Sequence, residues 1–159
     1  MQAEASSVRA EKASRPIAEL LACPPEIAIL LNSAAEYLEF SEGETVFRQG
    51  GQCRGLYVVV SGDLSRKTER LDTRLMLGTV RTGELVELAS ALGDGRHTYT
   101  LTAQSRSSVM LLPFEVLLKA FRAYPPLRMR LLEELAREVS RAYTMSCASR
   151  LAGVRKRGN

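Results

Sequence analysis

The spacing of hydrophobic positions changes twice along this chain, near Tyr37 and again at Pro113. Between these points, short runs rich in β-branched and aromatic residues follow one another, and glycines such as Gly43, Gly50 and Gly62 separate them. Short strands with glycine turns at regular spacing are typical of antiparallel sandwiches and barrels. We therefore predict a barrel of about seven or eight short antiparallel strands between Tyr37 and Leu112.

Helical patterns precede and follow this region. A helical stretch begins at Pro16, and Pro24-Pro25 opens a second short helix, because proline is favoured at a helix start. After Pro113, the segment FEVLLKAFRAY carries apolar residues at helical spacing, and Pro125-Pro126 ends this helix and starts a longer one. Apolar residues line one stripe of the last helix: Leu127, Leu131, Leu132, Leu135, Val139 and Tyr143.

Composition indicates a single globular domain, with 159 residues, 45% of them hydrophobic and 25% charged. We expect a disordered lead over residues 1–17, which are rich in alanine, serine and charge, and one domain over residues 18–150. Part of the net charge of +4 gathers in a basic tail over residues 151–159, which we interpret as a solvated chain end.

Several classes of protein are disfavoured by what the sequence lacks. No apolar run reaches membrane-spanning length, and the first residues have no apolar core of a signal peptide, so we expect a cytoplasmic protein without a membrane partner. Cys23, Cys53 and Cys147 are odd in number, far apart and without a C-x-x-C pair. We therefore predict reduced structural thiols, no disulfide framework and no metal site.

The stretch GELVELASALGDGRHTYTLTA, residues 83–103, has the outline of a loop that cradles a phosphate. It begins at Gly83, continues through a short helical turn around Leu88–Leu92 and the turn Gly93-Asp94-Gly95, and ends in an alternating strand. A short helix offers free backbone N–H groups to an anion, and glycine allows the backbone to approach it closely. We refer to residues 83–103 as the cassette.

Together with EGETVFRQGG, LYVVVSGDL and LLPFEVLLKAF, the cassette resembles the cyclic-nucleotide-binding domain of bacterial regulators of the cyclic AMP receptor protein/FNR type. The resemblance extends from about Pro24 to about Arg150. It implies a mainly β fold with flanking helices, an antiparallel β-roll or jelly-roll barrel (a double-stranded β-helix) followed by C-terminal helices. It also implies a regulatory domain rather than an enzyme.

Carried over residue by residue, the resemblance implies a degenerate cassette. The leading glycine of the family falls on Gly83, and the Gly-Glu pair that meets phosphate and ribose falls on Glu87 and Leu88. The arginine position falls on His97, with Arg96 one residue earlier, and the following serine or threonine falls on Thr98. The candidate pocket residues are Gly83, Glu84, Glu87, Leu88, Ala89, Ser90, Arg96, His97 and Thr98.

These replacements predict weak binding of a cyclic nucleotide or another small anion. Leu88 cannot accept a hydrogen bond from a ribose hydroxyl, Glu87 repels an anion, and His97 is mostly neutral at pH 7. A hydrogen bond to a charged group contributes about 1.5–3 kcal/mol, so losing two or three of them weakens a micromolar site to roughly millimolar. No cofactor is implied with certainty.

Each candidate side chain also has an ordinary structural interpretation. His97 is the single histidine and has no partner at ligand spacing, so we interpret it as a polar pocket or surface residue. Glu84 and Glu87 lie beside no candidate nucleophile, and we interpret them as loop acids. Ser90 and Thr98 either donate to a small anion or satisfy nearby backbone groups.

The last helix and the end of the chain leave the function open between alternatives. The resemblance implies a homodimer through this helix, and we assign the contact to Leu132, Leu135, Val139 and Tyr143. The domain is then a sensor that signals through its last helix, a ligand-free dimerisation or interaction module, or the effector domain of a transcription regulator. DNA is a partner only if a helix-turn-helix exists in a longer protein. A metal-dependent cupin-like enzyme is disfavoured by the single histidine.

Overall fold

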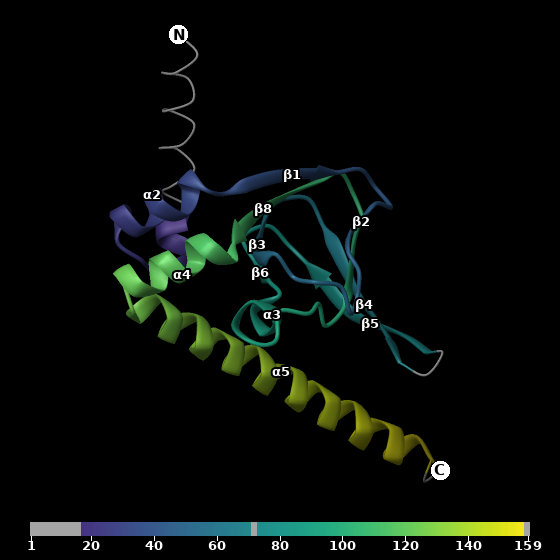
Figure 1. Cartoon of the computed structure of the whole chain (residues 1–159). Helices are drawn as coiled ribbons and strands as arrows, with labels where there is room; N and C mark the ends of the chain where they lie inside the picture. Colours follow the sequence, from purple (N-terminus) through teal and green to yellow (C-terminus); the bar gives the residue numbers. More distant parts are fainter. Residues whose placement is uncertain (1–16, 71–72, 158–159) are drawn as a thin grey trace.

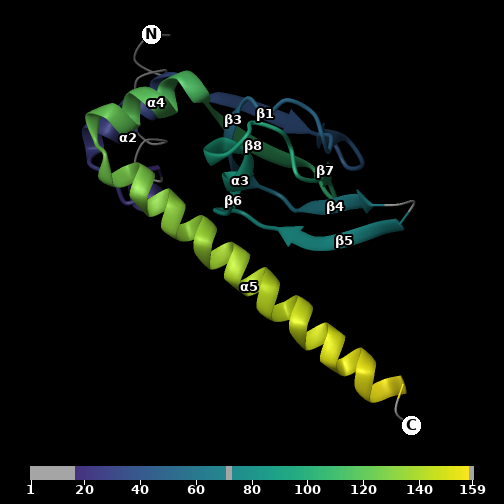
Figure 2. The ribbon, with the colours of Figure 1, turned by 60° about the horizontal axis from the view of Figure 1, so that its bottom comes forward.

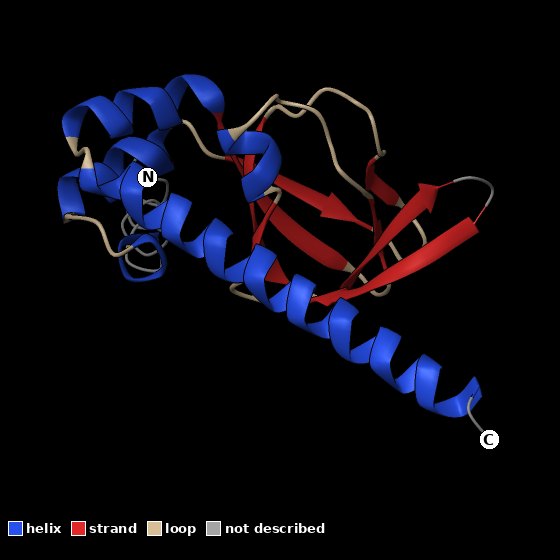
Figure 3. Ribbon diagram, turned by 90° about the horizontal axis from the view of Figure 1, so that it is seen from below, coloured by secondary structure: helices blue, strands red, loops and turns tan. Residues whose placement is uncertain are grey.

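Two four-stranded antiparallel sheets form the body of the protein (Figures 1 and 3). The computed structural model describes residues 17–70 and 73–157. One sheet has the strand order β1-β8-β3-β6 and the other β2-β7-β4-β5. The strands are β1 (Glu36–Phe40), β2 (Thr45–Phe47), β3 (Gly55–Ser61), β4 (Leu64–Arg70), β5 (Thr73–Val80), β6 (Leu85–Val86), β7 (Thr100–Ala103) and β8 (Ser107–Pro113). This arrangement confirms the predicted barrel and its limits.

The interior between the two sheets is apolar because alternate residues of the strands face it. In β7 the burial alternates, with Leu101 and Ala103 fully enclosed. They pack with buried residues of the facing strands, among them Val59, Leu64 and Val109. The same space also holds the rings of Phe47, Tyr57 and Tyr99.

A second core joins the helices to the β1-β8-β3-β6 sheet. The helices are α2 (Pro25–Ser33), α3 (Leu88–Leu92), α4 (Phe114–Ala123) and α5 (Pro126–Arg157), and residues 17–21 are also helical. Leu31 of α2, Leu117 of α4 and Leu127 of α5 are fully buried together with Leu56 and Leu112 of the sheet. The helix starts predicted at Pro25, after Pro113 and at Pro126 are confirmed.

The ends of the domain differ in part from the predicted boundaries. Of the disordered lead predicted over residues 1–17, residues 1–16 lie outside the described residues, and Ile17 is buried in the helical core. Helix α5 continues to Arg157, so the segment predicted as a tail beyond residue 150 is helical up to that point. Among the described helices, none combines the length and the apolarity that a membrane-spanning segment needs.

Helix α5 leaves the barrel along a straight path, and its second half extends beyond the sheets (Figure 2). The stripe predicted on this helix divides between two environments. Leu127 and Leu131 are buried, and Leu135 packs partly buried against the same core. Val139 and Tyr143, in contrast, are 60% and 72% exposed. Leu135 of the predicted contact surface therefore already has partners within the domain, and the dimer contact itself stays a prediction.

Candidate functional site

The cassette has the backbone that its sequence predicts. Gly83 begins it with a φ of 85°, and α3 forms the helical turn predicted around Leu88–Leu92. Glu87 precedes α3 in the left-handed region, with φ 71° and ψ 35°. This conformation favours glycine, because a side chain there costs conformational energy. The backbone at position 87 therefore fits the glycine that the family resemblance placed there.

The side chain of Glu87 is buried inside the cassette, with a residue exposure of 3%. Its Oε1 accepts hydrogen bonds from the Thr98 hydroxyl at 3.0 Å and from the Thr98 backbone N–H at 3.4 Å. Its Oε2 accepts a hydrogen bond from the Ser90 hydroxyl. The interpretation of Glu87 as an ordinary loop acid is wrong, because its carboxylate is buried and bonded to Ser90 of α3 and to Thr98 in the segment before β7. Glu84, by contrast, is exposed.

His97 is also buried, with a residue exposure of 5%, so its interpretation as a possible surface residue is wrong. Its ring stacks on Phe47 with ring centroids 3.7 Å apart and an interplanar angle of 5°. Nδ1 of His97 lies 3.3 Å from Oε2 of Glu87, but Nδ1 makes no hydrogen bond. The two side chains are therefore in close contact without hydrogen-bond geometry. Burial lowers the pKa of His97, and the Glu87 carboxylate opposes this shift only in part.

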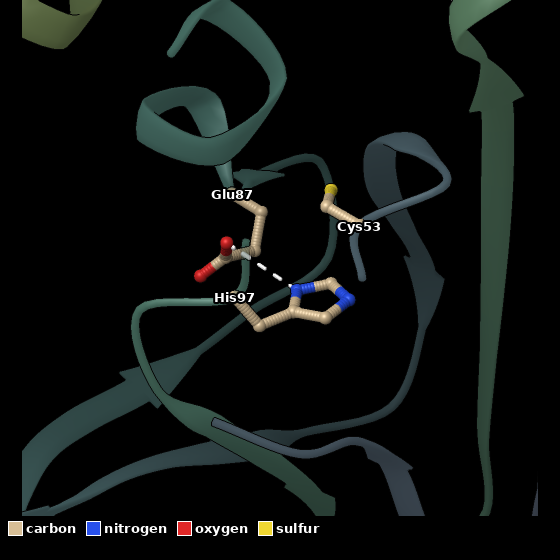
Figure 4. Close-up of side chains that lie close together, drawn as sticks. All are labelled: Cys53, Glu87 and His97. Carbon is tan, nitrogen blue, oxygen red and sulfur yellow. Dashed lines mark ion pairs between the residues drawn. The ribbon is translucent and has the colours of Figure 1, made fainter. Parts of the chain in front are cut away.

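Cys53 completes a cluster with these two residues, which we call the Cys53–Glu87–His97 cluster (Figure 4). One ligand-type atom of each side chain lies within 4.8 Å of the others. The thiol of Cys53 is 2% exposed and donates to the Gly55 carbonyl oxygen at 3.0 Å. The pKa of Cys53 is raised to about 11, with burial as the largest cause and the nearby Glu87 carboxylate as a further one. The expectation that His97 has no potential co-ligand is therefore wrong.

Comparisons with known proteins agree on the family. A sequence model described as "Cyclic nucleotide-binding domain" matches residues 37–124, more than half of the chain. The chain belongs to this family. No curated protein matches it.

Solved structures with this domain include regulators of transcription. The N-terminal domain of a transcriptional regulator from Streptomyces coelicolor A3(2) is 25% identical with a TM-score of 0.62, over 80% of this chain and 91% of that one. The catabolite activator protein of Thermus thermophilus is also 25% identical with a TM-score of 0.69, over 79% of this chain. The chain spans 59% of the length of the Thermus protein. The sensor domain of the transcriptional regulator DNR from Pseudomonas aeruginosa has the same fold, with a TM-score of 0.70 at 18% identity, over 91% of this chain and 95% of that one.

Within this cyclic nucleotide-binding domain, the predicted pocket residues separate into two groups. Glu87, Ser90, His97 and Thr98 meet through their side chains. Leu88 is buried, but it packs in the helical core rather than facing the cluster. Ala89 is exposed, and Arg96 is exposed with its guanidinium donating to the Gly50 carbonyl oxygen at 3.4 Å. The guanidinium of Arg96 is therefore engaged outside the cluster.

The sequence interpretation missed the residues that enclose the cluster. The ring of Tyr57 lies beside His97, with ring centroids 5.9 Å apart. Phe47 contacts the rings of both Tyr57 and Tyr99. Cys53 had been assigned to the structural thiols. Strand alternation favours an inward position for aromatic residues, but the approach of Cys53 to residues of the distant cassette depends on the closed barrel.

Proposed function

We propose that this domain is a regulatory sensor whose cassette does not bind cyclic nucleotides, because its own carboxylate occupies the anion cradle. One observation carries the proposal. Glu87 accepts hydrogen bonds from the Ser90 hydroxyl, the Thr98 hydroxyl and the Thr98 backbone N–H. These are donors of the kind that would hold a phosphate. An entering phosphate has to displace the carboxylate, and it meets charge repulsion as well.

The electrostatics of the cassette support the same proposal. The family position for a permanent cation holds His97, and burial lowers the pKa of this residue, so it stays neutral at pH 7. The nearest arginine in the sequence, Arg96, is exposed and bonded to Gly50. An anion buried without a fixed cation is costly. The rings of Phe47 and Tyr99 further reduce the room beneath the cassette.

We propose helix α5 as the output of the sensor and as its dimer contact. The cassette helix α3 packs against α5, so a rearrangement at Glu87 has a direct route to it. Val139 and Tyr143, which are 60% and 72% exposed, leave an apolar surface near the middle of α5.

A role as the effector domain of a transcription regulator is the second candidate. It is supported by the Streptomyces structure, which is itself an N-terminal domain of such a regulator and is covered to 91%. A DNA-binding partner region then belongs to a longer protein. A ligand-free dimerisation module remains the outcome if the cluster responds to no ligand.

Calorimetric titration of the metal-free protein with cyclic AMP and cyclic GMP tests whether Glu87 prevents nucleotide binding. We expect the wild type to bind neither tighter than about 1 mM. The double variant Glu87→Gly with His97→Arg removes the internal carboxylate and adds a fixed cation, and we expect it to bind at least about tenfold tighter. Leu88 stays unchanged, because glutamate at this fully buried position would place a charge in the helical core.

A matched control is Glu84→Gly, which removes an exposed carboxylate of the same cassette and should leave the affinity unchanged. Micromolar binding of either nucleotide by the wild type would show that Glu87 does not block the cradle and would refute the proposal.

A further inference from the structure

We propose that Cys53, Glu87 and His97 bind one divalent transition-metal ion of the zinc class, and that this ion is the ligand of the sensor. The inference rests on the proposed function in one respect, namely that a cyclic nucleotide does not occupy the cassette. It assigns the cluster a ligand through its donor atoms, which are a thiol sulfur, a carboxylate oxygen and an imidazole nitrogen. These are the three donor types that proteins use for zinc.

The buried nitrogen of His97 is the observation that calls for a ligand. Its side chain is 3% exposed, and Nδ1 has no hydrogen-bond partner although the Glu87 carboxylate is close by. Buried polar atoms without a hydrogen bond are rare in folded proteins. Nδ1 faces the Glu87 carboxylate, and Cys53 lies beside the imidazole ring (Figure 4). A metal ion between the three groups supplies the missing partner.

The distances suit a small tetrahedral ion after a modest rearrangement. Two ligand atoms bonded to one tetrahedral zinc lie about 3.3–3.7 Å apart, given bonds of roughly 2.0–2.3 Å. Oε2 of Glu87 and Nδ1 of His97 are already separated by 3.3 Å. All three ligand atoms lie within 4.8 Å, so the thiol sulfur has to approach by about 1 Å. The proposal requires the Cys53 side chain to rotate away from the Gly55 carbonyl oxygen, to which its thiol donates.

Neighbouring residues already orient two of the ligands. Oε1 of Glu87 is held by the hydroxyl and the backbone N–H of Thr98, and Oε2, which accepts from the Ser90 hydroxyl, also faces His97. The stack on Phe47 fixes the plane of the imidazole. Such outer partners hold the ligands of metal sites in place and tune their affinity.

Charge and ligand softness favour zinc over magnesium or calcium. Binding replaces the S–H bond of Cys53 by a metal–thiolate bond and releases the proton to solvent, while His97 binds as the neutral imidazole. One thiolate and one carboxylate then balance the two positive charges, so the buried site is neutral overall. Magnesium and calcium prefer sites made of oxygen ligands alone.

One surface pocket shares a lining residue with the cluster. A pocket of about 500 Å³ lies beside the cluster and is lined by Gln52, Cys53, Asp94, Gly95, Arg96 and Phe114. Because Cys53 belongs to both, an ion can enter there, and water or a small anion can complete the coordination. Zinc sites with three protein ligands commonly keep such an open position.

Titration of the chelator-treated protein with Co²⁺, followed by absorption, tests the site directly. We expect one cobalt ion per chain, with a thiolate-to-cobalt charge-transfer band in the near ultraviolet and intense tetrahedral bands in the visible, both removed by Zn²⁺. Cys53→Ser should abolish the charge-transfer band, and Cys147→Ser on α5 should retain it. Thr98→Val removes only the side-chain support of Glu87, and we expect it to weaken the affinity about 10- to 100-fold.

Absence of the bands in the folded wild type at saturating cobalt would overturn the inference, as would a charge-transfer band that survives in Cys53→Ser. Circular dichroism shows whether each variant is folded. If Cys53→Ser does not fold, the cobalt titrations of the wild type and of His97→Gln test the metal site instead. The nucleotide titration uses metal-free protein. The proposal that Glu87 blocks nucleotide binding and the proposal of a metal site are therefore tested separately.

Discussion

At the scale of single residues, Glu87 is the unusual position of the cassette. Its buried side chain stands where the family resemblance places a glycine next to a bound phosphate. Glu87 holds a left-handed conformation that is costly for a residue with a side chain, at about 1–2 kcal/mol. Three hydrogen bonds to its carboxylate offset this cost. The strain and the buried charge therefore occur at the same position, where the function is proposed.

Two glycines allow conformational strain to be separated from steric overlap. Gly43 and Gly62 have nearly equal φ angles of 86° and 87°. A Cβ at Gly43 meets no atom within 4 Å, whereas a Cβ at Gly62 would lie 2.6 Å from the Arg106 carbonyl oxygen. Gly62 is therefore required both for its φ angle and for the close approach of two chain segments.

We predict that Gly43→Ala lowers the free energy of unfolding by about 1–2 kcal/mol and that Gly62→Ala lowers it by at least about 3 kcal/mol. Urea denaturation of both variants measures the difference. Equal losses for the two variants would mean that the contact at Gly62 relaxes without cost.

At the scale of secondary-structure elements, α5 lies in two environments along its length. Its first turns close the helical core through Leu127 and Leu131, and Leu135 still packs on that core. Beyond this point Val139 and Tyr143 are exposed, while Glu134 forms ion pairs with Arg137 and Arg141 along the helix. An exposed apolar stripe beside charged positions is the pattern of a helix that pairs with a second helix.

We predict that Val139→Glu with Tyr143→Glu converts a dimer into monomers without changing the stability of the fold, because neither side chain is buried within the domain. Sedimentation velocity at roughly 50 µM protein measures the oligomeric state of the wild type and the variants. Ala148→Glu, on an exposed position of the same helix, should leave the dimer intact.

Leu135→Glu should behave differently and destabilise the domain itself, because it places a charge against the helical core. A wild type that is monomeric at this concentration would contradict the proposed dimer contact.

At the scale of the whole molecule, α5 and the barrel meet through charged groups as well as apolar ones. The guanidinium of Arg66 lies over the ring of Tyr99, 5.8 Å from its centroid. Partial burial raises the pKa of Glu138 on α5, the neighbouring Glu134 raises it further, and Arg66 and Arg141 lower it. The net upward shift means that the ionised carboxylate is disfavoured in the folded state.

We predict a small stabilisation from Glu138→Gln at neutral pH that disappears in acid. A carboxyl group with a raised folded pKa binds its proton more tightly in the native state, so stability falls as pH rises from about 4.5 through the folded pKa. Above that window the variant should be more stable by less than about 1 kcal/mol, because the group is only partly buried. Below pH 4.5, the ordinary value, the two proteins should be equal.

Urea denaturation at pH 7 and pH 4, at one protein concentration, compares the two proteins. Glu133→Gln, an exposed neighbour on α5, serves as the control and should show no such pH-dependent difference. A Glu138→Gln variant that is less stable than the wild type at pH 7 would show that attraction to Arg66 and Arg141 dominates.

The sequence by itself determined the elements and the fold. Hydrophobic period and glycine turns are local properties, and they placed the strands between Tyr37 and Leu112, the proline-started helices and the turn of α3 correctly. The left-handed conformation at Glu87 agrees with the glycine position that the family resemblance assigned. The family itself was also evident from the order of these motifs.

Only the tertiary structure decided which side chains meet. Closure of the two sheets brings Cys53 to Glu87 and His97, which no spacing in the sequence relates. The inward turn of Glu87 and the stacking of His97 depend on Phe47 of β2 and on Thr98 in the segment before β7, which are distant from one another in the sequence. Packing of Leu135 likewise follows from the angle at which α5 crosses the core. Burial and ligand geometry arise from contacts between distant segments, so periodicity along the chain does not contain them.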